Sequence, residues 1–152
     1  MPTRRQILAH SAAVAAALAA SGLLPARAQS AWNKAAFDAK SNEDVLKALG
    51  TSRPVESADV TLTAPDIAEN GAVVPIAAST SLPRAKSLAF LIEKNPTTLA
   101  GVFEFSDAVD TAVSTRVKMA QTSNVYAVAL LTDGRALYAK KEVKVTLGGC
   151  GG

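Results

Sequence analysis

The stretch NVYAVALLTDGRALYAKKEVKVTL, residues 124–147, predicts two β-strands joined by a tight turn. Asp133-Gly134 is a dipeptide that favours the two-residue turn of a β-hairpin. After the turn, apolar residues alternate with charged or polar ones over residues 142–147, which is typical of a strand with one buried face. These two segments are the sixth and seventh strands that the sequence predicts.

Five further segments with strand-like composition precede this pair at near-regular spacing. They cover residues 58–64, 72–79, 85–93, 99–106 and 111–121. The stretch PDIAENG at 65–71 has the proline, Asx and glycine chemistry of a turn, and Pro75 favours an edge strand or a bulge. About seven short strands predict an all-β fold, an immunoglobulin-like antiparallel β-sandwich over residues 56–147. The chain lacks the Cys-Trp-Cys core of antibody domains.

A short helical segment is predicted ahead of the sandwich, within residues 29–55. Ser41 and Asp44 form a pair like a capping box, and they open the helical stretch NEDVLKAL. Gly50 then ends the helix. The sequence leaves open whether this helix packs on its own sandwich or on a partner protein.

The first 28 residues have the features of a cleaved export signal. Arg4 and Arg5 precede an apolar run over residues 12–24, which is shorter than the ~20 residues that span a bilayer. The sequence Ala-Arg-Ala ending at Ala28 predicts cleavage after that residue. Paired arginines are typical of the twin-arginine route, which delivers a protein to the periplasm.

Two positions after the arginine pair depart from the usual twin-arginine pattern. Ile7 stands where that pattern has phenylalanine, and Ala9 stands where it has a basic residue. The general secretory route therefore stays open as an alternative. Both routes predict export, and the mature chain has no predicted membrane segment.

Removal of this signal changes the charge and the chemistry of the chain. Arg4, Arg5 and Arg27 account for the net charge of +3, and the 13 cationic residues that remain balance 13 acidic ones. A neutral mature chain gives no reason to expect nucleic-acid binding. The single histidine, His10, leaves with the signal, which excludes Cys/His zinc sites, Ser-His-Asp triads and Cys-His dyads. The sequence thus predicts no catalytic residue, no metal site and no cofactor.

The chain contains one cysteine, Cys150, with two glycines on each side. Residues 148–152, GGCGG, are predicted to form a flexible arm, because glycine has no Cβ and ordering such a segment is costly. Five extended residues span at most roughly 17 Å. An unperturbed cysteine thiol is mostly protonated at neutral pH, so a partner's site would have to activate it. A thin arm of this kind can deliver a covalently bound group into a narrow site on another protein.

The export signal, the small all-β domain and the terminal VKVTLGGCGG together resemble the SoxY family of the bacterial thiosulfate-oxidising Sox system. The resemblance covers essentially the whole chain, and GGCGG is its specific part. It implies that the substrate is attached covalently to Cys150. It further implies that Gly148, Gly149, Gly151 and Gly152 form the arm that carries this cysteine.

The resemblance also implies partners. A SoxY protein forms a heterodimer with SoxZ, and the haem enzyme SoxAX joins thiosulfate oxidatively to the cysteine. SoxB then releases sulfate by hydrolysis and leaves a persulfide, which the sulfane dehydrogenase SoxCD oxidises where it is present. The haem, manganese and molybdenum of this pathway belong to those partners.

Three other interpretations of the lone cysteine are open. The chain could be a periplasmic binding or structural module in which Cys150 forms an intermolecular disulfide. It could carry an engineered conjugation tag, or it could be a thiol enzyme in its own right. The four glycines do not favour a structural disulfide, which gains from order, and an enzyme would need a base that the chain lacks.

Overall fold

The computed structural model describes residues 3, 4, 6, 8 and 10, then residues 33–51 and 53–149. The chain divides into two compact units, Met1–Trp32 and Asn33–Gly152. Most of the predicted export signal lies outside the described residues, including Arg5 and the cleavage position after Ala28. Among the residues that are described, no helix is both long enough and apolar enough to cross a bilayer.

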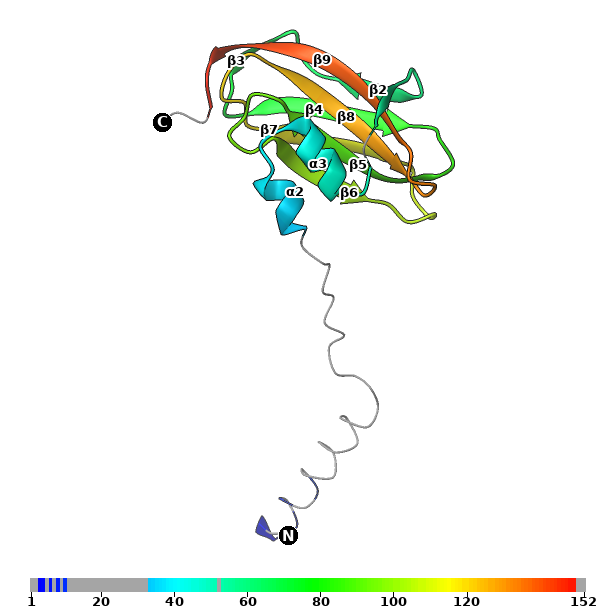
Figure 1. Ribbon diagram of the computed structural model, residues 1–152. Helices are drawn as coiled ribbons and strands as arrows, with labels where there is room; N and C mark the ends of the chain where they lie inside the picture. The colour runs from blue at the N-terminus through cyan, green and yellow to red at the C-terminus, as the bar shows by residue number, and fades with distance from the viewer. Residues whose placement is uncertain are drawn as a thin grey trace. The chain divides into compact units, whose positions relative to one another are not determined.

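Two short helices, α2 (Lys34–Asp38) and α3 (Asn42–Ala48), open the second unit (Figure 1). At the start of α3, the Ser41 hydroxyl accepts a hydrogen bond from the backbone N–H of Asp44 at 3.1 Å. The same hydroxyl donates to the Asp44 carboxylate at 2.7 Å. Gly50, with φ of +84°, follows the end of the helix. The predicted cap and the predicted helix end are both confirmed.

Replacing Ser41 with alanine should lower the free energy of unfolding by about 1 kcal/mol, because the cap of α3 is lost. Urea denaturation followed by circular dichroism measures this difference. Ser106→Ala is the control, since Ser106 is an exposed serine in a loop, and it should change stability by less than about 0.5 kcal/mol. Equal losses in both variants would contradict a specific role for the cap.

The described residues of this unit form nine strands. They are β1 (Val55–Glu56), β2 (Val60–Thr63), β3 (Ile67–Asn70), β4 (Val74–Thr80), β5 (Ala85–Ile92), β6 (Leu99–Glu104), β7 (Ala112–Val117), β8 (Ser123–Leu131) and β9 (Ala136–Leu147). All seven predicted strands are among them. The hairpin turn is confirmed as well, with Gly134 at φ +84° between β8 and β9.

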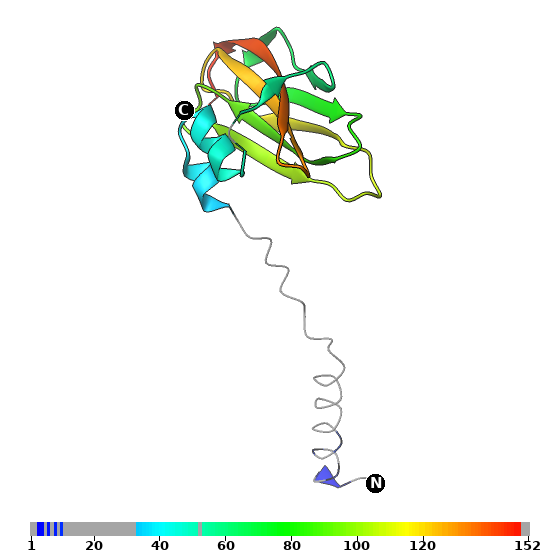
Figure 2. The ribbon, with the colours of Figure 1, turned by 45° about the vertical axis from the view of Figure 1, so that its right-hand side comes forward.

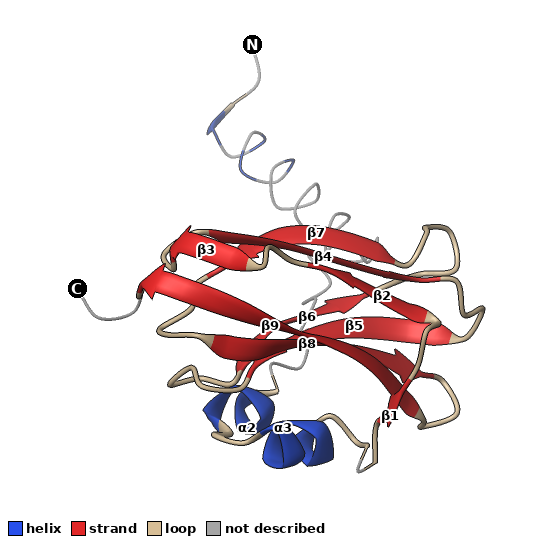
Figure 3. Ribbon diagram, turned by 90° about the horizontal axis from the view of Figure 1, so that it is seen from above, coloured by secondary structure: helices blue, strands red, loops and turns tan. Residues whose placement is uncertain are grey.

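The strands form two sheets. One has the order β1-β9-β8-β5-β6, with β3 also paired to β9, and the other has the order β2-β4-β7. Figure 3 shows β4 and β7 on one side of the larger sheet and the two helices on its other side. The molecule is therefore the predicted two-sheet β-sandwich with short N-terminal helices.

Strand β5 is buried on both faces and so connects two hydrophobic clusters. Leu88, Phe90 and Ile92 point into the core between the two sheets. Ala89 and Leu91 point to the opposite face, into a second cluster with apolar residues of α2 and α3. Figure 2 shows these helices lying against the larger sheet. The helical segment thus packs on its own sandwich, which answers the question that the sequence left open.

The sequence-based interpretation of residues 65–71 as a turn alone is wrong, because Ile67–Asn70 form β3. This strand pairs parallel with β9, with Ile67 opposite Lys144 and Asn70 opposite Leu147. Strand β9 runs four residues beyond its pairing with β8, which ends at Val143. Strand β3 pairs with this extension, since backbone N–H and C=O groups in a packed sheet need partners. Four residues flanked by turn chemistry show too little alternation to be recognised as a strand.

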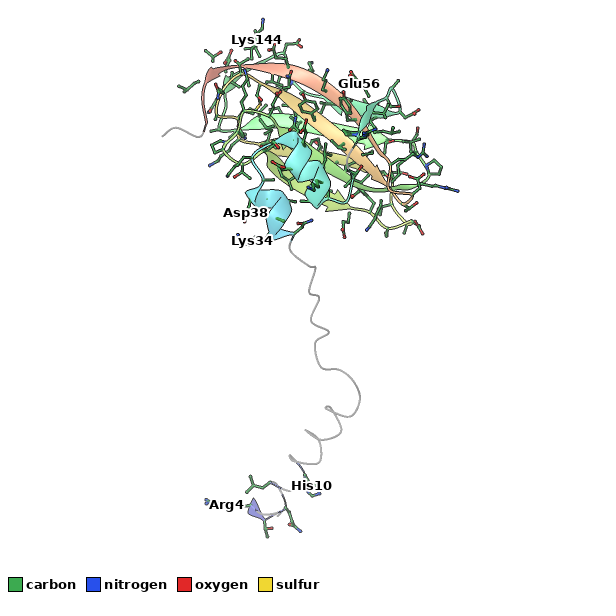
Figure 4. All side chains as sticks on the ribbon, viewed as in Figure 1. Arg4, His10, Lys34, Asp38, Glu56 and Lys144 are labelled. Carbon is green, nitrogen blue, oxygen red and sulfur yellow. The ribbon has the colours of Figure 1, made fainter. Side chains whose placement is uncertain are left out.

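Lys140 and Lys141 lie on β9 between the residues that pair with β1 and those that pair with β3. Lys141 Nζ donates to the Ala64 carbonyl at 2.6 Å and lies 2.9 Å from the Asp66 carboxylate. Lys140 Nζ lies 3.6 Å from the Glu56 carboxylate, and Glu56 is labelled in Figure 4. These contacts help to cover the one stretch of the outer edge of β9 that no strand pairs with.

Candidate functional site

Strand β9 carries the chain to the candidate site. It is twelve residues long and pairs along most of its length with β8. Lys144, labelled in Figure 4, marks the end of β9 that leads into the terminal glycines. Gly148 and Gly149 are described, whereas Cys150, Gly151 and Gly152 lie outside the described residues. The predicted roles of the last three residues therefore stay predictions.

Three backbone segments meet directly beyond β9, and we call this arrangement the glycine crossing. It consists of Gly71, the pair Met119–Ala120 and the end of β9 with the residues that follow it, Leu147–Gly149. The Gly149 N–H donates to the Met119 carbonyl at 2.9 Å, and the Met119 N–H donates to the Gly71 carbonyl at 2.7 Å. The Gly71 N–H in turn donates to the Leu147 carbonyl at 2.7 Å. These hydrogen bonds link the end of β9 to the turn between β3 and β4 and to the segment after β7.

The close approach at the glycine crossing leaves no room for a side chain. A Cβ on Gly148 would lie 2.2 Å from the Ala120 carbonyl oxygen, and a Cβ on Gly149 would lie 2.2 Å from the Ala72 nitrogen. A Cβ on Gly71 would lie 2.3 Å from the Met119 carbonyl oxygen. In each case the atom met is rigid backbone, so any other residue would push the segments apart.

Side chains fix the segment against which Gly149 rests. The Asn95 amide donates to the Lys118 carbonyl at 2.7 Å, and its oxygen accepts from the Ala120 N–H at 2.9 Å. Two residues further on, the Thr122 hydroxyl accepts from the Val145 N–H at 3.0 Å. Met119 is fully buried. The glycine crossing is therefore built on an anchored part of the fold.

Sequence reasoning found part of this arrangement. It singled out Gly148 and Gly149 as part of a flexible arm. In the structure, both glycines pack against backbone. It did not single out Gly71 or Met119. Gly71 stands in the turn-like PDIAENG stretch, which is the only sequence signal that could have drawn attention to it.

Two of the pockets in the described part of the chain, both away from the glycine crossing, are lined by titratable side chains. One, of about 420 Å³, lies between α3 and the larger sheet and is lined by Tyr126 and Tyr138. The other, of about 610 Å³, is lined by Asp107 and Asp110, which lie in the connection between β6 and β7. The described residues hold no cluster of three or more His, Cys, Asp or Glu side chains that could bind a metal ion.

Two side chains of the β8–β9 hairpin have shifted pKa values with clear causes. Burial raises the pKa of the Tyr126 phenol, and the nearby Glu93 carboxylate raises it further. At the hairpin turn, the hydrogen bond from Arg135 lowers the pKa of the Asp133 carboxyl group. Tyr126 is thus neutral at physiological pH and Asp133 is ionised, and neither provides a base beside the chain end.

A comparison with models of protein families assigns the chain to one family. Residues 45–150 match the family model described as sulfur oxidation protein SoxY. The matched span covers more than half of the chain, contains every strand of the sandwich and ends on Cys150. The chain belongs to the SoxY family. It is therefore a member of a family of sulfur carriers in sulfur oxidation, as the terminal GGCGG stretch indicated.

A solved structure agrees with this assignment. The sulfur carrier protein SoxY from Chlorobium limicola f thiosulfatophilum is 35% identical to the chain, with a TM-score of 0.61. The alignment covers 68% of this chain and 94% of that one. The SoxY fold therefore extends over nearly the whole of that protein and two thirds of the present chain.

Weaker likenesses to other solved structures carry no functional argument. A superoxide reductase (neelaredoxin) from Ignicoccus hospitalis is 18% identical, with a TM-score of 0.47 over 57% of this chain and 78% of its own. The fibronectin(III)-like modules of CbhA from Clostridium thermocellum are 22% identical, with a TM-score of 0.45 over 57% of this chain and 93% of theirs. Comparison with curated proteins gives no match.

Proposed function

We propose that this SoxY-family chain carries sulfur intermediates covalently on the thiol of Cys150 during thiosulfate oxidation. The observation that carries the proposal is the family match, which runs up to Cys150, the single cysteine of the chain. The position of Cys150 supports it further, because the residue directly follows Gly149 at the end of the sandwich. The proposal expects a partner to reach a thiol at this position without unfolding the core.

The first step is an oxidative conjugation. The Cys150 sulfur forms a bond to the outer sulfur of thiosulfate, the thiol loses its proton, and two electrons pass to an acceptor. The product is a cysteine S-thiosulfonate. The chain itself holds no acceptor among its described residues, and the haem enzyme SoxAX supplies one in this proposal.

The later steps regenerate the thiol. SoxB adds water across the terminal sulfur–sulfur bond, which releases sulfate and two protons and leaves a persulfide on Cys150. SoxCD, where present, removes six electrons from the outer sulfur, adds three oxygen atoms from three water molecules and releases six protons. A second hydrolysis by SoxB then releases sulfate and restores the thiol.

The proposal places the mature chain in the periplasm as a heterodimer with SoxZ. The arginine pair and apolar run of the export signal support export by the twin-arginine route. The remaining partners, SoxAX, SoxB and SoxCD, bind in turn and receive the chain end that carries Cys150. We propose no membrane anchor, no nucleic acid and no cofactor for the mature chain.

The decisive experiment is the intact mass of the exported chain purified without reductant and measured before and after reduction. The proposal expects a mass above that of residues 29–152 by one or more sulfur atoms or by thiosulfate. This increment should vanish on reduction. A mass of twice the chain that halves on reduction, with no small adduct, would favour the disulfide-linked module instead.

The thinness of the arm can be tested at Gly151. Gly151→Val should leave the rate of alkylation by a small reagent such as iodoacetamide unchanged, because the thiol itself is untouched. Processing by partner enzymes should fall about tenfold or more in kcat/KM, because a branched side chain misplaces the thiol in a narrow channel. Equal kcat/KM values for the variant and the natural chain would contradict the need for a thin arm.

A further inference from the structure

Gly149 makes two kinds of contact that a freely moving arm would lack. Its N–H donates to the Met119 carbonyl at 2.9 Å. Its Cα lies so close to Gly71 that an added Cβ would lie 2.2 Å from the Gly71 carbonyl carbon. The contact is reciprocal, since a Cβ on Gly71 would lie 2.8 Å from the Gly149 nitrogen. Gly71 comes from the turn between β3 and β4, more than seventy residues earlier in the chain.

We propose that Gly71 and Gly149 are positioning residues for the thiol of Cys150. Their close contact fixes the point at which the chain end leaves the sandwich, so that Gly148 and Gly149 stay with the sandwich. This inference rests on the proposed carrier function for its purpose. Its geometry rests on the glycine crossing alone.

The last fixed residue before Cys150, which we call the pivot, decides how far the thiol can move. With Gly148 and Gly149 free, the Cys150 Cα could move roughly 10 Å from the Leu147 Cα, at ~3.3–3.6 Å per residue. With Gly149 held, the Cys150 Cα stays ~3.8 Å from a fixed Cα. A partner enzyme must then approach the glycine crossing closely, and it meets the thiol within a small volume. Such confinement lowers the entropy cost of bringing the thiol to a reacting group.

A pivot at Gly149 places different requirements on Gly149 and Gly151, the two glycines next to Cys150. Gly149 must be glycine because backbone atoms of Gly71 and Ala72 occupy the space of a side chain. Gly151 lies beyond the thiol, and the proposal requires only that it be narrow. An alanine at Gly149 should therefore release the segment, whereas an alanine at Gly151 should not.

The test uses the full exported chain, labelled with ¹⁵N, together with any subunit that co-purifies with it. The heteronuclear NOE and hydrogen exchange of the Gly148 and Gly149 amides are compared with those of β9. In the natural chain, we expect the heteronuclear NOE of both amides to match that of β9, and we expect the Gly149 amide to be protected from exchange by its hydrogen bond to Met119. Gly149→Ala should accelerate exchange at residue 149 about tenfold, because its hydrogen bond is lost. The matched control Gly151→Ala should leave exchange at Gly149 unchanged.

A second readout connects this order to function. Gly149→Ala should keep the natural rate of alkylation by iodoacetamide and lower kcat/KM for loading by the thiosulfate-conjugating partner several-fold, mainly through KM. The reciprocal variant Gly71→Ala, in preparations that fold, should lower the order of the same two amides, Gly148 and Gly149. A spin label on Cys150 should broaden amides near Gly71 and Ala120 in the natural chain and broaden a wider set in Gly149→Ala.

Two results would overturn the inference. One is exchange at Gly149 in the natural chain that is as fast as in an unstructured peptide. The other is exchange at residue 149 that is equally fast in Gly149→Ala and Gly151→Ala. Either finding, in a chain that still loads thiosulfate, would remove the pivot and leave the carrier function standing. An ordered Gly149 in a chain that never acquires a sulfur adduct would instead overturn the carrier function, and the assigned purpose of the pivot with it.

Discussion

Replacing Cys150 with serine is expected to abolish every reductant-sensitive mass increase of the exported chain. Serine keeps the size of the side chain and removes the sulfur that forms the sulfur–sulfur bond in the proposed function. The thermal midpoint and the circular dichroism spectrum should match those of the natural chain, with a change in stability below about 0.5 kcal/mol. Intact mass, measured before and after incubation with thiosulfate and the conjugating partner, checks this.

The control for this variant is binding of the partner subunit. Cys150 follows the glycine crossing in the sequence, and the proposal gives it no role in the interface, so co-purification of a SoxZ-type subunit should be unaffected. Loss of that complex in Cys150→Ser would place the arm in the interface and contradict the carrier account. A sulfur adduct that persists on the serine variant would contradict attachment at Cys150.

Replacing Phe90 with alanine is expected to lower the free energy of unfolding by about 3–5 kcal/mol. Phe90 is fully buried between the two sheets. Its ring meets that of Phe103 edge-on, with centroids 6.0 Å apart and an interplanar angle of 78°. The variant loses both the apolar transfer energy and this contact, and it leaves a cavity. Urea denaturation of the natural chain and the variant measures the difference.

Phe103→Ala is the matched control, because it removes the other ring of the same pair from a partly exposed site. It should cost less than Phe90→Ala, since less of its surface is withdrawn from water. A larger loss for Phe103→Ala would mean that β6 and not β5 holds the centre of the core. The fraction of Phe90→Ala that stays folded should still load thiosulfate, because Cys150 follows the last strand in the sequence.

Strand periodicity in the sequence predicted most of the fold. The seven predicted strands correspond to β2 and β4–β9, and the Asp133-Gly134 turn joins β8 to β9. These signals are local: alternation, β-branched residues and turn dipeptides depend on a few neighbouring residues. The Ser41 cap was found for the same reason, because a capping pair lies within four consecutive residues.

Strand β3 was missed because local sequence signals do not report pairing between distant segments. Its pairing depends on β9, about eighty residues further along the chain, extending beyond β8. Pro75 is a related case. Strand β4 is central in its sheet, yet Pro75 lies beyond the stretch paired with β2, so it has a neighbouring strand on one side only. A proline signal can indicate local edge character without indicating that the whole strand is an edge.

The amino-acid sequence was sufficient for the sandwich, the helix cap, the lone thiol and the family, because each is written in neighbouring residues or in the terminal GGCGG stretch. Only the tertiary structure decided that the helices pack on their own sheet, that β3 pairs with β9, and that Gly71 meets Gly149. Glycine is found both where the backbone is free to move and where two backbones pack too closely for a side chain. Which of the two applies at Gly149 depends on the backbone that faces it, and only the folded structure brings Gly71 to that position.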